Sequence, residues 1–363
     1  MSRIFLACYR KYFYYNNMNS TFTIVQELDG IRLDEFLAVK FLQYSKGHLK
    51  KLVEEGLVRL NGKRTSWSQF VYAGDIITIT SSLPLKTSAF SPQPSALLPL
   101  DVLYEDESLL AVNKPAGVPV VPERGCTERL FLDSLVYYLS NVSPISKERS
   151  DVRPRLVHRL DKDASGVIVI AKDIDTKRTL TKQFENRLIE KEYVGIVDGE
   201  LKKDSPQPSA FSPQPSALFG RIELPIGEIR PGRMKIDYLH GKPSLTEFKV
   251  MEQFEGFALL SIFPRTGRTH QIRVHMKAIG HPLSVDPIYG RRNALYLSEL
   301  KKGYKSKDDV RESPLISRLT LHAFRLTLDL PSGDKRVTIE APVPKDLNIL
   351  LKSLRRYKIG NRR

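Results

Sequence analysis

The chain has 363 residues, enough for one catalytic domain and a smaller module, and 41% of them are hydrophobic, which excludes global disorder. Its 57 lysines and arginines outnumber 41 acidic residues, for a net charge of +16. This excess favours a polyanionic partner such as nucleic acid, although charge alone fits a basic enzyme of another kind equally well. Two cysteines, Cys8 and Cys126, exclude a disulfide framework and a thiolate zinc site, which indicates a reducing compartment. No apolar run approaches the roughly 18 residues that span a bilayer, so no membrane partner is expected.

Residues 1–19 are rich in aromatic side chains and contain three basic residues and no acidic ones. We expect these residues to form a disordered N-terminal extension, and we expect the protein to be cytoplasmic. An organelle-targeting segment is the alternative, and it would place the protein in a stroma or matrix. Met18 also leaves a later translation start open.

Residues 20–82 are predicted to form a compact module. Apolar side chains recur at helical spacing in residues 33–41 and again in 49–53, which indicates two short amphipathic helices. The pair Asn61-Gly62 predicts a tight turn between two strands.

Basic side chains crowd the second helix and this turn. They are Lys46, His48, Lys50, Lys51, Arg59, Lys63 and Arg64. By themselves they could be a solvated charged face. The segments RLDEFL (32–37) and LVEEGLVRLNGK (52–63), however, resemble the S-four-like RNA-binding domain. That resemblance implies that phosphates of RNA contact a set of five of them: Lys46, Lys50, Lys51, Lys63 and Arg64.

A proline-rich segment occurs twice. SAFSPQPSAL stands at Ser88–Leu97, within an expected linker over residues 83–99, and again at Ser209–Leu218. Proline at this density excludes helix and sheet interiors, so the second copy predicts a low-complexity insertion over residues 204–219. A polyproline ligand for a protein partner is the alternative interpretation.

Residues 100–345 mix strands and helices in uneven groups, which favours an α+β domain over strict βαβ alternation. Helices are predicted over 174–189 and over 270–279, where Gly280 marks the stop. The lysine-rich stretch 291–311 is expected to be an exposed loop, and residues 346–363 a basic C-terminal tail. The predicted strands are 109–113, 166–172, 191–197, 257–263, 319–328 and 336–339.

The chemistry points to VHRLDKDASGVIVIAKD, residues 157–173, since no phosphate-binding glycine loop, HExxH or GxSxG is present. Here Asp161 precedes a fully apolar strand and is flanked by cations. A salt-bridged turn would look the same, and Asp163 is a rival carboxylate that spacing alone does not exclude. His270 and His275 are five residues apart, on different helix faces, which makes a metal site improbable.

Five ordered motifs change this balance, because together they resemble the RluA-type pseudouridine synthases across nearly all of residues 100–345. They are YEDESLLAVNKPAGVPVVP (104–122), HRLDKDASG (158–166), KEYVGIVDG (191–199), PRTGRTHQIRVHMKAIGHPLSVDPIYG (264–290) and RLTLHAFRL (318–326). Two positions depart from the family pattern, Ala164 in place of threonine and Val121 where histidine is common. The resemblance implies an α+β fold with a mixed, mainly antiparallel sheet, and an isomerase of RNA uridines.

The resemblance also assigns roles. It selects Asp161 as the catalytic carboxylate, with Arg273 as the partner that keeps it ionised and oriented. Tyr193 is expected to stack on the flipped base and to assist proton removal from its carbon five. Further substrate contacts are implied for Arg159, which would enter the RNA stack, and for His158, Leu156 and Ile272, the last two as walls of the uracil site.

The reaction explains these residue types. Breaking the glycosidic bond builds positive charge on the ribose, which one carboxylate can stabilise, trap or serve as a base, so neither cofactor nor metal is required. We expect RNA as the partner, large-subunit ribosomal RNA first and transfer RNA as an alternative, with the protein a monomer that has no obligate protein partner. An inactive RNA-binding factor and a nucleic-acid glycosylase are the competing interpretations.

Overall fold

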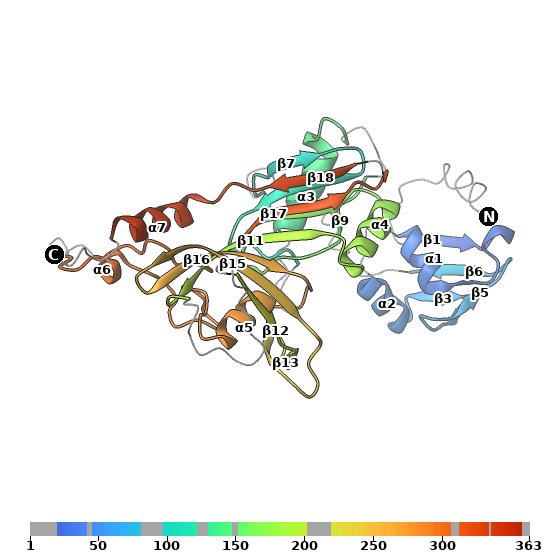
Figure 1. Cartoon of the computed structure of the whole chain (residues 1–363). Coiled ribbons are helices and arrows are strands. Elements are labelled where there is room, and N and C mark those ends of the chain that lie inside the picture. The colour runs from blue at the N-terminus through green and yellow to red at the C-terminus, as the bar shows by residue number, and fades with distance from the viewer. Residues whose placement is uncertain are drawn as a thin grey trace. The chain divides into compact units, whose positions relative to one another are not determined.

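The computed structural model describes residues 20–41, 46–80, 97–121, 130–146, 152–201, 219–305, 312–333 and 335–357. The expected extension over 1–19, most of the linker and nearly all of the insertion lie outside these ranges. The chain divides into two compact units, residues 1–91 and 92–363. Figure 1 draws both units and labels many of their elements.

The smaller unit is a helical pair packed on short antiparallel strands. Its four-stranded sheet has the order β1-β6-β3-β4, and β2 pairs with β5. Its elements are β1 (Ser20–Thr23), a 3-10 turn (Gln26–Leu28), β2 (Ile31–Arg32), α1 (Leu33–Lys40), α2 (Lys46–Glu54), β3 (Val58–Leu60), β4 (Lys63–Arg64), β5 (Phe70–Val71) and β6 (Ile76–Ile79).

Both predicted apolar stripes of this unit are buried in one core, together with Ile24, Val58 and Val71. The expected turn is also present. Asn61 and Gly62 both have positive φ, 49° and 74°, between the paired residues Leu60 and Lys63. This is the geometry of a two-residue hairpin, which asparagine and glycine adopt with little strain.

The larger unit is built on a ten-stranded sheet of order β12-β15-β16-β11-β17-β10-β8-β7, with β18 beside β17 and β9 beside β10. Among the described strands, β10 and β17 form the one parallel pair, which confirms a mixed, mainly antiparallel sheet. The strands are β7 (Asp101–Glu105), β8 (Leu109–Lys114), β9 (Arg155–Leu156), β10 (Ser165–Ala171), β11 (Glu190–Asp198), β12 (Phe219–Glu223), β15 (Leu245–Phe254), β16 (Phe257–Pro264), β17 (Leu321–Asp329) and β18 (Arg336–Glu340). A separate hairpin joins β13 (Ile226–Arg230) to β14 (Arg233–Ile236).

Helices cover both faces of the sheet around β10. Val167 and Val169 point to a core cluster that includes Leu180 of α4 (Ile174–Glu185). Ile168 and Ile170 point the other way, to a cluster with Phe131 and Leu135 of α3 (Leu130–Tyr137). Since alternate side chains of a strand lie on opposite faces, an unbroken apolar run is what a doubly covered strand requires.

Helix α4 ends earlier than predicted. Asn186 caps it and Arg187 has a φ of 59°, so Leu188 is exposed rather than part of the apolar stripe. The other helices of this unit are a π-helical turn (Tyr138–Val142), α5 (Gln271–Ala278), α6 (Leu297–Leu300) and α7 (Lys345–Arg356).

Two segments differ from their predictions near the C-terminus. In the stretch expected to be an exposed loop, Leu295 and Leu300 are buried. Residues 345–356 form α7, whose apolar stripe packs into the same cluster as both leucines, so this part of the expected basic tail belongs to the larger unit. The stripe follows helical spacing, and the basic residues on the opposite face obscured it.

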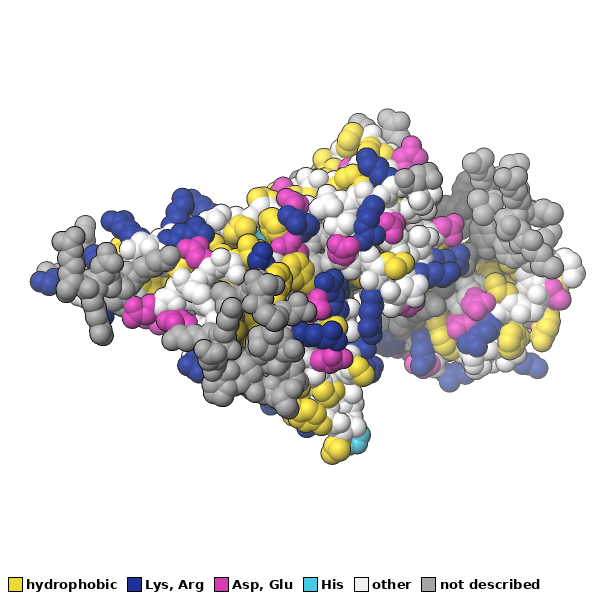
Figure 2. Space-filling view, in the orientation of Figure 1, with side chains coloured by type: hydrophobic (Ala, Val, Ile, Leu, Met, Phe, Trp, Pro, Cys, Tyr) yellow, Lys and Arg dark blue, Asp and Glu magenta, His cyan; other side chains and the backbone are white. Residues whose placement is uncertain are grey.

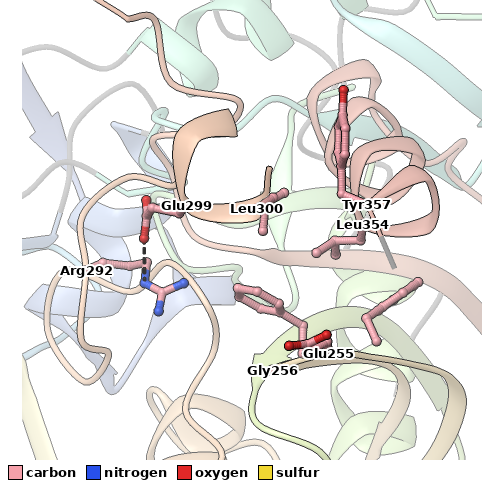
Figure 3. Close-up of a pocket in the computed structure, with 9 residues that line it drawn as sticks. Glu255, Gly256, Arg292, Glu299, Leu300, Leu354 and Tyr357 are labelled. Atoms are coloured by element: carbon pink, nitrogen blue, oxygen red, sulfur yellow. Dashed lines mark ion pairs between the residues drawn. The ribbon is translucent and has the colours of Figure 1, made fainter. Parts of the chain in front are cut away.

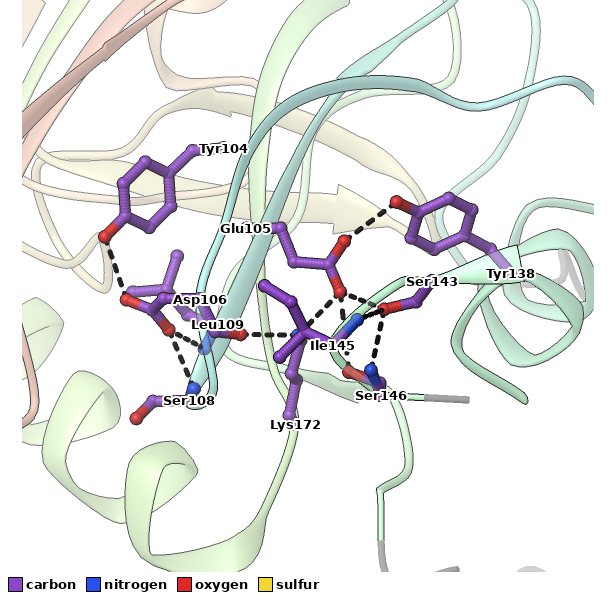
Figure 4. A network of polar contacts seen from close by, with 10 residues as sticks. All are labelled: Tyr104, Glu105, Asp106, Ser108, Leu109, Tyr138, Ser143, Ile145, Ser146 and Lys172. Carbon is purple, nitrogen blue, oxygen red and sulfur yellow. Dashed lines mark hydrogen bonds and ion pairs between the residues drawn. The ribbon is translucent and has the colours of Figure 1, made fainter. Parts of the chain in front are cut away.

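A buried polar network holds strand β7 at the edge of the sheet (Figure 4). The Lys172 ammonium is fully buried and lies 2.6 Å from the Glu105 carboxylate. That carboxylate also accepts hydrogen bonds from Tyr138 and Ser143. Burial alone raises the pKa of Glu105, but these partners, Lys172 foremost, lower it on balance, so the carboxyl stays ionised. The network ties β7 to the end of β10 and to the π-helical turn.

Among the described residues, no helix has the length and apolar character to cross a membrane.

Candidate active site

Asp161 lies in the loop that joins β9 to β10. Leu156 of β9 pairs with Ile170 of β10, so the chain folds back and brings residues 157–164 to the beginning of β10. At that point Gly166 pairs with Ala323 of β17 and has a φ of +117°. A Cβ on Gly166 would lie 2.1 Å from the Ala323 carbonyl oxygen, so only glycine allows the two strands to meet here.

The buried Lys114 ammonium bonds to the backbone of the Asp161 loop. Lys114 Nζ donates to the carbonyl oxygens of Pro115, Val118 and Lys162 at 2.7, 2.8 and 3.0 Å. Burial lowers the pKa of Lys114 to about 7, against the opposing charges of Asp163 and Asp161. The lysine thus joins the first motif, residues 104–122, to the Asp161 loop.

A chain of three charges fixes the Asp161 carboxylate. Arg273 Nη1 donates to Asp161 Oδ2 at 3.1 Å, and the same guanidinium donates twice to Asp286, at 2.8 and 2.7 Å. Arg273 and Asp286 are almost fully buried, whereas the Asp161 side chain is 19% exposed. Burial alone lowers the pKa of Arg273. The hydrogen bonds and negative charges of Asp286, and then of Asp161, outweigh burial and raise this pKa on balance. The guanidinium therefore presents a permanent positive charge to Asp161.

Helix α5 holds Arg273 in place because its own polar side chains are fastened to the sheet. Gln271 donates to the Leu245 carbonyl and to Thr246, and accepts from Thr266. His275, one turn later, contacts Thr246 Oγ1 at 2.9 Å and the Leu224 carbonyl at 3.0 Å. Rotation of the helix would break all of these contacts.

Tyr193 reaches the same place from β11, which lies on the other side of β17. The register of β11 against β17 shifts between Glu192 and Tyr193, a bulge that redirects side chains. Burial, and then the negative charge of Asp161, raise the pKa of the Tyr193 phenol. The phenol is therefore protonated at neutral pH.

The side chains of Asp161, Arg273 and Tyr193 line one cleft of about 420 Å³. Its remaining lining residues come from the Asp161 loop, the end of α4 and the segment after it, the strands β11 and β17, and the stretch from the end of β16 to the start of α5. The predicted residues that line it are His158, Arg159, Asp161, Tyr193, Ile272 and Arg273.

The rim of the cleft is basic. Arg159 is exposed, and Arg187, Lys191, Arg265 and Arg268 also line the cleft. Figure 2 shows Lys and Arg side chains gathered on the drawn face of the larger unit, between α4 and the neighbouring end of β15. Burial, followed by the charges of Arg265 and Arg187, lowers the pKa of Lys191 to about 8. Such a basic rim attracts a polyanionic chain toward the cleft, although the Asp161 carboxylate inside the cleft is negative and would repel it.

Comparison with known proteins identifies the fold and the family. A family model described as RNA pseudouridylate synthase matches residues 108–278, and an S4 domain model matches residues 31–77. The chain is 34% identical over 335 residues to the ribosomal large subunit pseudouridine synthase D of Neisseria meningitidis, covering 92% of this chain and 81% of that protein. The enzyme of the same name from Escherichia coli O157:H7 is 30% identical over 92% of this chain and 94% of its own length. The chain belongs to the RNA pseudouridine synthase family.

The RluA-type resemblance is thereby confirmed, and the protein is an RNA-modifying isomerase. A solved structure with the same fold is that of human RNA pseudouridylate synthase domain containing 4. It is 24% identical, has a TM-score of 0.51, and the match covers 70% of this chain and 93% of that one.

Two residues predicted to contact substrate in this synthase have other surroundings. Leu156 does not line the cleft; it packs in the core cluster beneath α3, opposite Ile170. His158 lines the cleft, but its Nε2 accepts a hydrogen bond from the backbone of Val169, and its ring stacks on Phe184. Burial, followed by the charge of Lys191, lowers the pKa of His158 to about 3, so it is neutral rather than one of the expected cations.

The sequence did not single out Asp286 or Lys114, and it brought His270 into view only as an improbable metal ligand. Asp286 stands in the SVDPIYG segment of the fourth motif and Lys114 in the NKPAG segment of the first. Both are buried ionisable residues, which single-sequence patterns do not distinguish from exposed ones. Only their partners in space give them a role.

In the smaller unit, Lys50, Lys51, Lys63 and Arg64 are exposed, and the side chain of Lys46 lies outside the described residues. Lys50 and Lys51 each lie near a glutamate four residues later, at 3.6 and 3.5 Å. Exposed pairs of this kind are weak and leave the ammonium groups free to meet phosphates.

A second cavity of about 300 Å³ lies away from Asp161, under α6 and α7 (Figure 3). Arg292 and Glu299 line it with an ion-pair distance of 3.9 Å, beside Leu354 and Tyr357. None of the predicted site residues lines it. Within the described ranges, no group of three or more histidine, cysteine or acidic side chains is placed to hold a metal ion.

The depressed pKa of His158 predicts acid sensitivity. Its folded pKa of about 3 lies below the ordinary value of 6.5, so the unfolded chain takes up the proton first. The stability that this histidine contributes is complete above pH 6.5 and is lost as the pH falls toward 3, by up to about 1.4 kcal/mol per pH unit. Urea unfolding of wild type and His158→Gln at pH 7 and 4.5 should show a smaller loss in the variant. Equal losses would contradict a His158 that is neutral in the folded protein.

Proposed function

We propose that this synthase isomerises specific uridines of large-subunit ribosomal RNA to pseudouridine, and that Asp161 is its catalytic carboxylate. The observation that carries the proposal is the Asp161–Arg273–Asp286 chain at the cleft. It provides a carboxylate that is accessible from the cleft and is held beside a permanently charged guanidinium. Asp163 lines no part of that cleft.

The chemistry requires such a group. Cleavage of the bond between ribose and uracil develops positive charge on the sugar, and an oriented carboxylate lowers the barrier by stabilising that charge or by bonding to it. Because uracil leaves as an anion and stays in the cleft, no second carboxylate is needed, in contrast to glycoside hydrolysis. The step involves no change of oxidation state, so the proposal needs no cofactor or metal.

Tyr193 and Arg159 are proposed to handle the base. The Tyr193 phenol, protonated and lining the cleft with Asp161, offers a flat surface for uracil to stack on. Because its raised pKa makes it a poor base, its part in removing the proton from carbon five rests on the family resemblance alone. A base inside an RNA helix has to swing out to reach the cleft, and the exposed Arg159 can occupy the space that it leaves. Ile272, together with Leu160 and Leu321, is proposed to wall the uracil in place of Leu156.

The choice of ribosomal RNA is supported by the relatives, several of which are ribosomal large subunit pseudouridine synthases. The S4 domain is proposed to supply affinity through its exposed lysines and arginine. We also propose that the protein acts as a monomer without a protein partner. Purified protein and transcribed large-subunit RNA, with tritium at carbon five of uridine, should therefore suffice for tritium release. Release of free base instead would indicate a glycosylase.

Asp161→Asn removes the negative charge but keeps the size of the side chain. Tritium release should fall at least about a thousandfold, equivalent to ~4 kcal/mol of transition-state stabilisation. RNA affinity should hardly change, because phosphate contacts come from basic residues. Asp163→Asn, two residues away, is the matched control and should stay largely active. Substantial tritium release by folded Asp161→Asn, or loss of release in Asp163→Asn alone, would disprove the assignment.

Replacing Lys50, Lys51, Lys63 and Arg64 together by glutamine should weaken RNA binding and flatten its salt dependence. Each lost phosphate contact reduces the slope of log affinity against log salt by about 0.7 to 0.9. The matched control replaces four exposed lysines of the larger unit, Lys301, Lys302, Lys345 and Lys352, for the same change in net charge. If both variants change the slope equally, overall charge rather than the S4 domain accounts for binding.

A further inference from the structure

His270 has an unusual backbone conformation beside the catalytic carboxylate. It immediately precedes α5 with a φ of 55° and ψ of 21°, a left-handed conformation that residues other than glycine rarely adopt. Its side chain is 13% exposed and lines the cleft. Local strain of this kind persists where the surrounding structure holds a side chain in a required place.

A contact with Tyr289 fixes the orientation of the His270 imidazole ring. His270 Nδ1 lies 2.9 Å from the hydroxyl oxygen of Tyr289, and that oxygen already accepts a hydrogen bond from the backbone N–H of Met234, at 2.8 Å. The phenolic O–H can therefore donate to Nδ1, and the neutral ring then carries its single N–H proton on Nε2. Burial lowers the pKa of His270, so the ring is neutral and Nε2–H is a hydrogen-bond donor at neutral pH.

That donor faces Asp161 across a gap. His270 Nε2 lies 3.9 Å from Asp161 Oδ1, too far for a direct hydrogen bond. Arg273 occupies the other carboxylate oxygen, Oδ2, and within the described part of the chain no hydrogen bond reaches Oδ1. One oxygen atom about 2.8 Å from each fits between the two groups. It has to accept from Nε2–H and donate to the carboxylate, and among the groups of a bound RNA only a hydroxyl does both.

RNA carries one such group per nucleotide. The 3′ and 5′ oxygens of an internal nucleotide are phosphodiester oxygens without protons. Uracil offers carbonyl oxygens, which only accept, and ring N–H, which only donates. The 2′-hydroxyl both donates and accepts, and it distinguishes RNA from DNA.

We propose, on the basis of the proposed function, that His270 and Asp161 together hold the 2′-hydroxyl of the target ribose. His270 Nε2–H donates to the hydroxyl oxygen, and the hydroxyl donates to Asp161 Oδ1. This contact places the carboxylate against the sugar carbons where charge develops. It makes His270 a residue that determines specificity for ribose.

The test combines a change in the enzyme with a change in the substrate. Once the modified uridine is mapped, two synthetic RNAs are compared that carry uridine or 2′-deoxyuridine at that position. His270→Gly removes the imidazole, and glycine tolerates the φ of 55°, so the fold is preserved. With uridine the variant should lose about tenfold or more in kcat/KM, as expected for one hydrogen bond at the reacting sugar. With 2′-deoxyuridine, where wild type has already lost the contact, the two enzymes should differ less than twofold.

Two further variants separate this role from a general structural one. Tyr289→Phe removes the hydroxyl that orients the ring and should show the same dependence on the 2′-hydroxyl, with a smaller loss. His240→Gly, in an exposed turn, is the matched control and should leave the ratio of the two RNAs as in wild type. If 2′-deoxyuridine is converted too slowly to measure, the dissociation constants of both RNAs provide the same comparison.

Equal losses on both RNAs, or no loss in His270→Gly, would overturn this inference while leaving the proposed function intact. A wild-type protein that forms no pseudouridine in any RNA would overturn the proposed function and this inference with it.

Discussion

The Arg273 guanidinium is almost fully buried and yet charged, and most of the active site follows from this constraint. A buried charge without partners costs several kcal/mol, so the fold has to supply acceptors for it. Asp286 takes two of its N–H groups and Asp161 a third. The Asp286 carboxylate accepts hydrogen bonds from Arg273 and from the backbone N–H groups of Ile288 and Tyr289 in the turn that follows it. Asp161 remains partly open to the cleft, and it is therefore the carboxylate that a substrate can reach.

The sheet explains why these groups meet. The Asp161 loop, Tyr193 and α5 belong to segments far apart in the sequence, but β10, β17 and β11 are neighbours in the sheet, and β16 next to β11 leads into α5. Gly166 allows β10 to approach β17 without a side chain between them. Lys114 then fastens the loop to the first motif. Backbone pairing and buried polar contacts thus set the geometry of the candidate site, and the cleft is lined by the side chains that remain accessible.

The sequence was informative where local pattern and motif coincide. The fully buried strand β10, the Asn61-Gly62 turn and the two stripes of the small unit followed from the apolar run, helical periodicity and turn chemistry. The contact between Asp161 and Arg273, 112 residues apart, came from the family motifs, since no local rule links them. Leu156 was predicted as a wall of the uracil site but packs in the core, because adjacency to Asp161 does not reveal which way a side chain points. His158 does line the cleft, but it is neutral rather than a cation. Asp286 and His270 acquire their roles only through partners in space. The contacts expected between RNA and the small unit stay predictions.

In the proposed function, Asp286 acts on catalysis through Arg273 without touching the substrate. The most direct measurement is turnover of Asp286→Asn, which leaves Asp161 and Arg273 in place but removes the charge that balances the guanidinium. We expect kcat for pseudouridine formation to fall at least about tenfold, as for the loss of an outer partner of an active-site group, while the dissociation constant for RNA stays within twofold of wild type. A folded variant with unchanged kcat would contradict this role of Asp286.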